Sequence, residues 1–354
     1  MKQKVKVLVV LSFISMSFLF FGCTTKVAVQ MLQPAKYHQA SLTKTVAVLP
    51  FSGKNGQEFS LEIESVISGV TIDGKPYFNL VDRVMLDKAI SEMKLSTSGL
   101  IEPATAVKLG KMVQAQGIYT GSVSVANTKD QRYTERREEC ERIEQKYNPK
   151  TKENENTGRC LSWRRWTVNC VKRTANFSAV PKLIAVETGR VFYSQNISGN
   201  ANAAGCEDGT PPSDEHTLLG QAKAQALKTF RNDIAPYYQT SMIKIMESDD
   251  KISVSLAKDK LKEGVNWADK KRLDAACNSW GEAYNLAPNS PSLLYNLGVC
   301  AESRADFKAA LDLYKKADNE LGKPDDDITL AILRADNAVK NQKKLEEQVK
   351  SMVN

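Results

Sequence analysis

Hydrophobic positions between residues 76 and 125 alternate between short apolar runs and helical spacing, which predicts a compact α/β unit. Apolar runs at both ends predict strands, and stripes at every third or fourth position between them predict two amphipathic helices. Pro103 stands where a first helical turn needs no N–H, so it marks the start of the second helix. The four segments, in order, are Tyr77–Val81, Leu86–Met93, Pro103–Val113 and Ile118–Val125.

The same reasoning extends this unit into a mixed sheet with flanking helices, an α/β domain over 45–246. One added strand is apolar on both faces, as in the centre of a sheet, and two others flank a Glu-Thr-Gly turn of the kind that joins antiparallel strands. The added strands are Thr45–Phe51, Thr174–Val186 and Val191–Ser198, and the added helices are Phe59–Val70 and His216–Met246, the last interrupted at Pro236.

A charge-dense insertion at about 127–173 interrupts this domain. Residues 129–173 hold thirteen Lys and Arg against eight Asp and Glu. Turn signals at Asn148-Pro149 and Asn156–Gly158 predict either a long hairpin or an excursion between two strands. Such a stretch cannot supply a lipid-facing band, because each charge at the bilayer midplane costs about 2–4 kcal/mol, so pore formation is disfavoured.

A period of 34 residues dominates the sequence after residue 252. Small, apolar or aromatic residues recur at this separation in five pairs: Gly264 and Gly298, Leu273 and Phe307, Ala276 and Ala310, Trp280 and Tyr314, Ala283 and Ala317. This is the period of tetratricopeptide repeats, and residues 290–317 resemble the consensus of that family. The resemblance implies an all-α helical repeat domain at 252–354, which ends in a capping helix that Asp325–Asp327 begins.

The first residues have the pattern of a signal peptide. Residues 1–22 begin with lysines and continue as an apolar run of about fifteen residues, which is short for a membrane span. Gly22-Cys23 follows, and LFFGC resembles the lipobox of bacterial lipoproteins, although Phe20 stands where leucine is usual. The resemblance implies that Cys23 carries lipid, and Thr24 after it implies the outer membrane, facing the periplasm. The alternative is an ordinary secreted protein with a stray thiol.

Residues 23–44 show no periodicity and contain scattered Gln, Pro and Lys, so we expect a tether between the lipid and the first strand.

Two stretches of the α/β domain resemble a known family. VAVLPF at 46–51 and FNLVDRVMLDKAISEMKLSTSGLIEPATAVKLGKMVQAQGIYTGSV at 78–123 are similar to the domain shared by the curli secretion lipoprotein CsgG and its relatives, LpoB among them. The resemblance covers about 45–246 and implies a scaffold whose members do different jobs. Asp82 and Arg83 within it are either a binding pair or a helix cap and the first helical residue.

Composition and charge exclude several classes of function. The net charge of +8 over 354 residues is modest, so nucleic acid is not an implied partner. The histidines, His38 and His216, lie far apart in the sequence, with no Cys-x-x-Cys or His-x-x-x-His motif near either. We therefore expect no enzymatic activity, no metal and no cofactor.

Seven cysteines suit an oxidising compartment. Setting Cys23 aside leaves six disulfide candidates, an even number: Cys140, Cys160, Cys170, Cys206, Cys277 and Cys300. The first four allow three pairings, among which the sequence does not decide. Cys277 and Cys300 fall on helices that a repeat stack makes adjacent, so we expect them to pair.

Two groups of residues are candidates for binding a partner. Trp163 and Arg165, in the run Trp163–Trp166, could grip an anionic glycan or an acidic protein surface; alternatively, the two tryptophans cover the sheet edge. In a tetratricopeptide array the first helix of each repeat lines the concave face. Lys262 and Asn296, with Arg304 at the edge, are therefore expected to be exposed there and to hold an extended peptide.

These observations favour a lipid-anchored scaffold or adaptor that binds envelope proteins or peptides through the CsgG-like domain and the repeat groove. One alternative is a ring-forming homo-oligomer in a secretion or assembly apparatus. A further alternative is an enzyme acting on peptidoglycan, for which the sequence offers no catalytic constellation.

Overall fold

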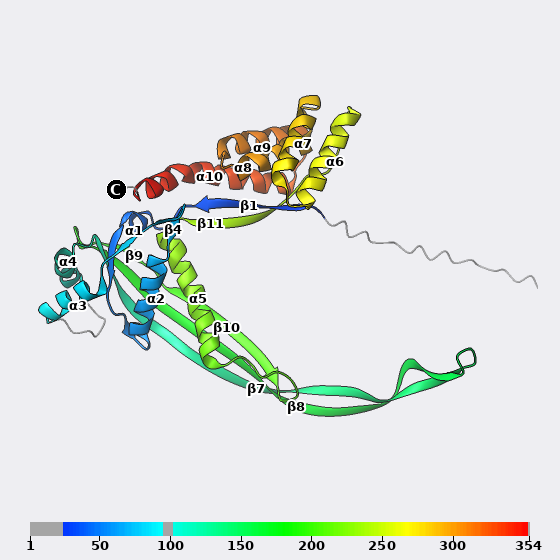
Figure 1. The fold of residues 1–354 in the computed structure, drawn as a ribbon, viewed down its shortest axis with the longest axis horizontal. Coiled ribbons are helices and arrows are strands. Elements are labelled where there is room, and N and C mark those ends of the chain that lie inside the picture. The colour runs from blue at the N-terminus through cyan, green and yellow to red at the C-terminus, as the bar shows by residue number, and fades with distance from the viewer. Residues whose placement is uncertain (1–23, 95–101, 353–354) are drawn as a thin grey trace, which may run out of the picture. The chain divides into compact units, whose positions relative to one another are not determined.

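The computed structural model describes residues 24–94 and 102–352, and Figure 1 shows their fold. The chain divides into two units. Of the described residues, the α/β unit comprises 32–239 and 340–352, and the helical unit comprises 240–339 and 24–31. The expected signal peptide at 1–22 and the lipidation candidate Cys23 lie outside the described residues.

The α/β unit contains a seven-stranded mixed sheet with a main path β10-β8-β7-β2-β6. Strand β2 lies parallel to β6 and β7, whereas β8 lies antiparallel to β7, β9 and β10. The strands are β2 (Thr45–Val48), β3 (Ser52–Gly53), β6 (Asn79–Leu80), β7 (Gly117–Asn148), β8 (Glu153–Ala185), β9 (Val191–Ser194) and β10 (Ile197–Cys206); β4 (Thr71–Ile72) and β5 (Lys75–Pro76) pair separately.

Helices cover both faces of this sheet, so the unit has three layers. The alternation of β2 sends Val46 and Val48 into one core with Phe59 and Phe230, and sends Ala47 into another. Helices α2 and α5 contribute to the first core, and α3 and α4 contribute to the second. The helices of this unit are α1 (His38–Leu42), α2 (Gly56–Ser68), α3 (Arg83–Glu92), α4 (Pro103–Met112) and α5 (Glu215–Ile234).

Strands β7 and β8 extend far beyond the rest of their sheet as a two-stranded ribbon (Figure 1). They pair from Gly117 opposite Ala185 to Asn148 opposite Glu153, with irregular register near Cys140. The predicted insertion is therefore a long hairpin. Between Ala126 and Val168 no residue is buried. We call residues 127–167 the outer hairpin.

The helical unit contains two helix pairs, α6 with α7 and α8 with α9, followed by α10. Within each pair the backbone of one helix lies against an aromatic ring of the other. A Cβ atom at Gly264 would overlap the Trp280 ring, and one at Gly298 would overlap the Tyr314 ring. The 34-residue period thus coincides with a repeated packing contact. The helices are α6 (Ser255–Asp269), α7 (Leu273–Leu286), α8 (Pro291–Ser303), α9 (Phe307–Leu321) and α10 (Asp326–Lys350).

Two sequence predictions are wrong at the ends of the α/β domain. The expected tether at 23–44 forms strand β1 (Lys26–Gln33) and helix α1, because Val27, Val29 and Met31 alternate with period two and are buried in the helical core. The predicted helix to Met246 ends at Ile234, and Tyr237–Lys244 forms strand β11, which pairs with β1. Pro236 has no N–H to continue the helix.

Candidate functional site

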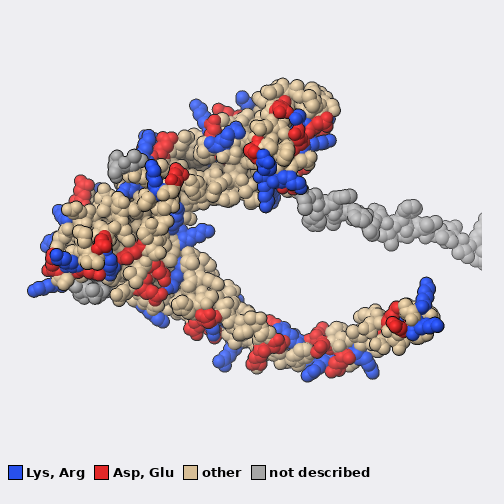
Figure 2. All heavy atoms as spheres, in the orientation of Figure 1, with Lys and Arg blue, Asp and Glu red and all other residues tan. Residues whose placement is uncertain are grey.

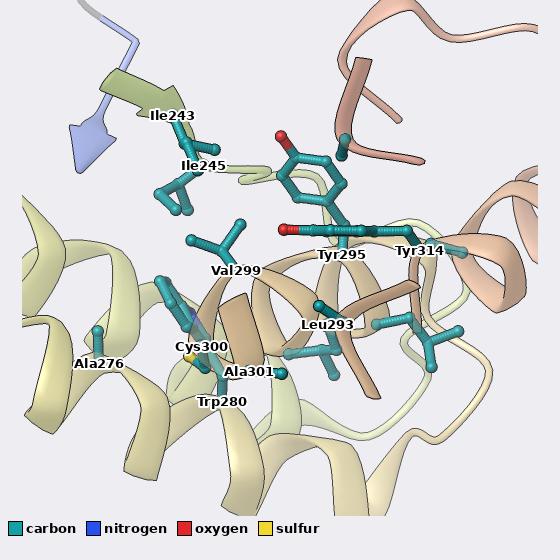
Figure 3. Packing of buried hydrophobic residues seen from close by; sticks show 14 of the residues in the cluster. Ile243, Ile245, Ala276, Trp280, Leu293, Tyr295, Val299, Cys300, Ala301 and Tyr314 are labelled. Carbon is teal, nitrogen blue, oxygen red and sulfur yellow. The ribbon is translucent and has the colours of Figure 1, made fainter. Parts of the chain in front are cut away.

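Asn296 is not exposed in a groove, contrary to the sequence prediction. Its side chain has 0% exposure, accepts a hydrogen bond from the Met246 N–H (3.0 Å) and donates one to the Met246 carbonyl oxygen (2.8 Å). The segment after β11 therefore occupies this position of α8, and Figure 3 shows its Ile245 pointing toward Val299. The reason is non-local, since an extended part of the same chain, fifty residues earlier, satisfies the amide.

The other two residues predicted to hold a peptide are exposed. Lys262 lies on an exposed position of α6, and Arg304 is the exposed C-cap of α8. With Asn296 buried beneath Met246, the three residues do not form one open peptide surface.

The outer hairpin divides the predicted basic and aromatic cluster between two faces. Residues opposite each other in an antiparallel pair share a face, and neighbours along a strand do not. One face holds Trp163 opposite Cys140 and Arg165 opposite Glu138. The other face holds Trp166 opposite Arg137, with Arg164 5.6 Å from the Trp166 ring. We call Trp163, Arg165, Glu138 and Arg136, which share the first face, the Trp163 face.

The Trp163 face is open, whereas the opposite face is partly covered. Trp163 is 50% exposed, and the Arg165–Glu138 ion pair (3.3 Å) is exposed enough to contribute little to stability. On the opposite face Arg137 pairs with Asp208 at 2.8 Å, and this hydrogen bond holds the pKa of Asp208 below its usual value. Figure 2 shows positive and negative side chains interspersed along the ribbon.

Disulfides hold the hairpin where burial does not. Cys140 is bonded to Cys160 within the outer hairpin, and Cys170 to Cys206 at its base. Close to the base, Arg173 donates two hydrogen bonds of 2.8 Å to the Asp130 carboxylate, which lower the pKa of Asp130. In the helical unit the structure joins Cys277 to Cys300, the pair expected from the repeat spacing.

An open cavity of about 710 Å³ lies beside the Cys170–Cys206 disulfide. Arg132 and Glu207 line it with opposite charges, and Asn169 donates hydrogen bonds to Glu207. Within residues 24–94 and 102–352, one group of three potential metal ligands occurs here, formed by Glu135 with the two cysteines. Because both sulfur atoms belong to the disulfide, neither is available as a thiolate ligand.

Lys44 is the centre of an enclosed polar cluster. Burial lowers the pKa of Lys44 to about 7, and its Nζ donates to the carbonyl oxygens of Ser41 (2.8 Å) and Gln348 (3.4 Å) above the Tyr77 ring. The Gln348 side chain also exchanges hydrogen bonds with the Ala35 backbone. These five residues fasten the end of the chain to the α/β unit. A substrate has no access to Lys44, since it is 8% exposed and Ser41 and Gln348 are 0% exposed.

Asp82 and Arg83 do not form a binding pair. The Asp82 carboxylate accepts hydrogen bonds from the backbone N–H groups of Val84 (2.9 Å) and Met85 (3.2 Å), so it caps α3. Arg83 pairs instead with Glu64 at 2.8 Å and with Asp87 at 3.1 Å.

Among the helices that the structure describes, none combines the length and the apolar character needed to cross a membrane.

No family model matches the sequence, and no curated protein matches it. Three solved structures are similar. The LpoB C-terminal domain from Salmonella enterica is 14% identical, over 44% of this chain and 82% of its own, with a TM-score of 0.24. Lipoprotein GNA1162 from Neisseria meningitidis is 11% identical over 53% and 99%, with a TM-score of 0.27. The PelC dodecamer from Paraburkholderia phytofirmans is 15% identical over 59% and 99%, with a TM-score of 0.21. TM-scores of this size do not establish a shared fold.

Proposed function

We propose that this protein is a lipid-anchored adaptor of the bacterial envelope that presents the outer hairpin to a protein partner. The signal-peptide pattern of residues 1–22 and the lipobox-like position of Cys23 support the proposed localisation, on the periplasmic side of the outer membrane. The resemblance of residues 45–246 to CsgG-like domains and of residues 252–354 to tetratricopeptide repeats supports a scaffold made for protein contacts. The repeat groove is not the proposed site, because Met246 covers Asn296.

The observation that carries the proposal is an outer hairpin with no buried residue. A two-stranded ribbon in water is at best marginally stable by itself. Here the Cys140–Cys160 and Cys170–Cys206 disulfides restrict the unfolded chain and thereby favour one shape. A chain that keeps such a ribbon ordered without a core gains a preformed surface, and preformed surfaces lose less entropy on binding.

The Trp163 face indicates the chemistry of the partner. Tryptophan and arginine are the residues most enriched among binding hot spots, and Trp163 and Arg165 lie two positions apart on one exposed face. Arg136 and Glu138 stand on the facing strand. A folded protein surface with an apolar pocket for Trp163, bordered by a carboxylate for the arginines, fits this arrangement.

The test compares two exposed Trp–Arg pairs after a photo-crosslinker at position 163 has identified the partner. Trp163→Ala with Arg165→Ala is expected to weaken binding of the purified partner more than tenfold. Truncating a hot-spot residue to alanine costs about 2 kcal/mol of binding free energy, and this variant truncates two. The control is Trp267→Ala with Arg272→Ala, because Trp267 is 38% exposed and Arg272 lies 5.7 Å from its ring. Equal affinities for the two variants would reject the Trp163 face.

A ring-forming homo-oligomer is the second candidate, and the strand edges favour it. Among the described residues, no strand pairs with the outer edge of β7 beyond Val123 or with that of β8 before Cys170. Free edges of this kind can pair with another chain. Light scattering on the purified protein at micromolar concentration distinguishes the two, because the adaptor is expected to be a monomer.

We further propose that the protein has no enzymatic activity. The proposal rests on two histidines that lie far apart in the sequence and on the enclosure of Lys44, which is 8% exposed. Incubation with purified peptidoglycan is expected to release no soluble fragments.

A further inference from the structure

The first described residues of the chain, Thr24 and Thr25, lie against the helical unit. Thr24 lines two adjoining pockets of about 350 and 280 Å³. The Thr25 N–H donates to the Glu247 carboxylate at 3.2 Å, and the Thr25 carbonyl oxygen accepts from the Ile245 N–H at 2.9 Å. Strand β1 then begins at Lys26. The chain therefore has no slack between residue 24 and the helical core.

This attachment limits how far a lipid at Cys23 can be from the helical unit. One peptide bond joins Cys23 to Thr24, and consecutive Cα atoms are about 3.8 Å apart. The tether predicted for residues 23–44 would have allowed tens of ångströms, because a flexible chain of that length extends about 5–6 Å times the square root of its length. With β1 in its place, an acylated Cys23 brings the bilayer to the surface around Thr24.

The surface around Thr24 has the composition of a membrane contact. Met242 and Leu330 line the smaller pocket with Thr24, and their exposed fractions are 63% and 60%. Lys26, Lys244 and Arg334 line the same pocket. Lys26 is exposed, and a long basic side chain at an interface can place its charged end among headgroups while its stem covers apolar surface. Large apolar side chains gathered at one exposed place mark interaction sites.

The charges of this surface suit a phospholipid leaflet rather than a strongly charged ligand. Lys244 pairs with Asp327 at 3.0 Å, and Arg334 pairs with the buried Glu302. Lys26 is exposed and has no ion-pair partner among the residues that the structure describes. A nearly balanced set of charges beside two exposed apolar side chains, Met242 and Leu330, matches zwitterionic headgroups above acyl chains.

We propose that the surface formed by Thr24, Lys26, Met242, Leu330 and Arg334 contacts the phospholipid leaflet that carries the lipid of Cys23. The inference rests on the proposed lipid anchor and adds a face to it: the helical unit lies on the membrane, with Met242 and Leu330 in the interface.

The test places a tryptophan on this surface and asks whether lipid reaches it. Lipidated protein carrying Leu330→Trp is reconstituted into vesicles of phosphatidylethanolamine and phosphatidylglycerol, with or without brominated acyl chains. The matched control is Leu286→Trp, on an exposed leucine (42%) of the same unit that lines neither pocket. The four native tryptophans are common to both proteins and cancel in the comparison.

Flotation of the vesicles reports whether the protein is attached to the membrane, and bromine quenching reports whether the introduced tryptophan contacts the acyl chains. We expect both variants to float and only the tryptophan at position 330 to lose fluorescence to brominated lipid. Flotation with no quenching at position 330 would overturn the membrane face and leave the anchor intact. Equal quenching at both positions would also overturn it, as would a tryptophan at 330 shielded from lipid and from soluble acrylamide, which would indicate a protein partner. Failure to float would remove the anchor and this inference together.

Discussion

In the helical unit Trp280 has no exposed surface, whereas Trp163 in the outer hairpin is 50% exposed. Each region contains a disulfide that closes a loop of similar length, 23 residues in the helical unit and 20 in the outer hairpin. In the first region the bond adds to a packed core, and in the second it stands in for one. We therefore expect loss of the disulfide to weaken the helical unit without disordering it and to disorder the outer hairpin.

The largest expected effect distinguishes the two tryptophans. Trp280→Ala removes a fully buried ring and its hydrogen bond to the Leu261 carbonyl oxygen (3.2 Å), so it should lower the free energy of unfolding by about 3–5 kcal/mol. Trp163→Ala should change it by less than about 0.5 kcal/mol. Urea unfolding followed by helical circular dichroism measures both. Similar losses for the two variants would mean that the hairpin has a core after all.

Removing one disulfide at a time should separate the regions next. Replacement of both Cys140 and Cys160 by serine removes about 3 kcal/mol of loop constraint, and amides of the outer hairpin should lose their protection from hydrogen exchange. The same change at Cys277 and Cys300 should lower the melting temperature while α7 and α8 keep their protection, because packing still holds them. Hydrogen exchange read by mass spectrometry reports both results, and an outer hairpin that stayed protected would contradict the comparison.

Within the helical unit, Asn296 should behave as a structural residue. Asn296→Ala leaves the N–H and the carbonyl of Met246 without their partner, which should cost about 1–3 kcal/mol and lower the melting temperature. Lys262→Ala, on the exposed side of α6, is the control and should leave the melting temperature unchanged. An unchanged melting temperature for Asn296→Ala would contradict this role and would support the prediction that Asn296 is exposed in an open groove.

The smallest expected effect is acid loosening of the hairpin base. The pKa values of Asp130 and Asp208 are lowered by hydrogen bonds from Arg173 and Arg137. The stability that these two ionised carboxylates give to the base of the hairpin is therefore fully present above the ordinary aspartate pKa of 3.8. It is lost as the pH falls through their lowered pKa values. Hydrogen exchange near Asp130, corrected for its intrinsic pH dependence, should rise only below about pH 3.8. Asp208→Asn should remove part of this rise, and a rise beginning at pH 5 would point to other groups.

The sequence predicted local structure well where one segment carries its own signal. The stripe of α4 behind Pro103 indicates a helix without reference to distant residues, and the continuous apolar run that begins at Thr45 likewise indicates strand β2. The 34-residue period likewise identified Gly264 and Trp280 as equivalent to Gly298 and Tyr314, and the structure shows the same glycine–aromatic contact in both repeats.

What the sequence did not predict depends on partners far along the chain. Strand β1 pairs with β11, which lies some 200 residues later in the sequence. Without that partner in view, the short alternating run of β1 among Gln and Lys was interpreted as a tether. The exposure of Asn296 was argued from the helix alone, and Met246, which buries it, belongs to another segment. The choice among three pairings of four cysteines required the register of β7, β8 and β10. Strand β10 itself carries small residues with little apolar signal.

The division of the chain into units has a consequence for when the protein can fold. The first described residues, through Met31, belong to the helical unit, and the residues from Lys340 onward belong to the α/β unit. Gln348, six residues from the last, satisfies Ala35, Lys44 and Tyr77. A growing chain emerges in sequence order, so the α/β unit lacks Gln348 until more than three hundred residues after Ala35 have been made. Residues 24–31 are made more than two hundred residues before the rest of the helical unit, so they cannot pack against it until Thr240 and the residues after it have emerged.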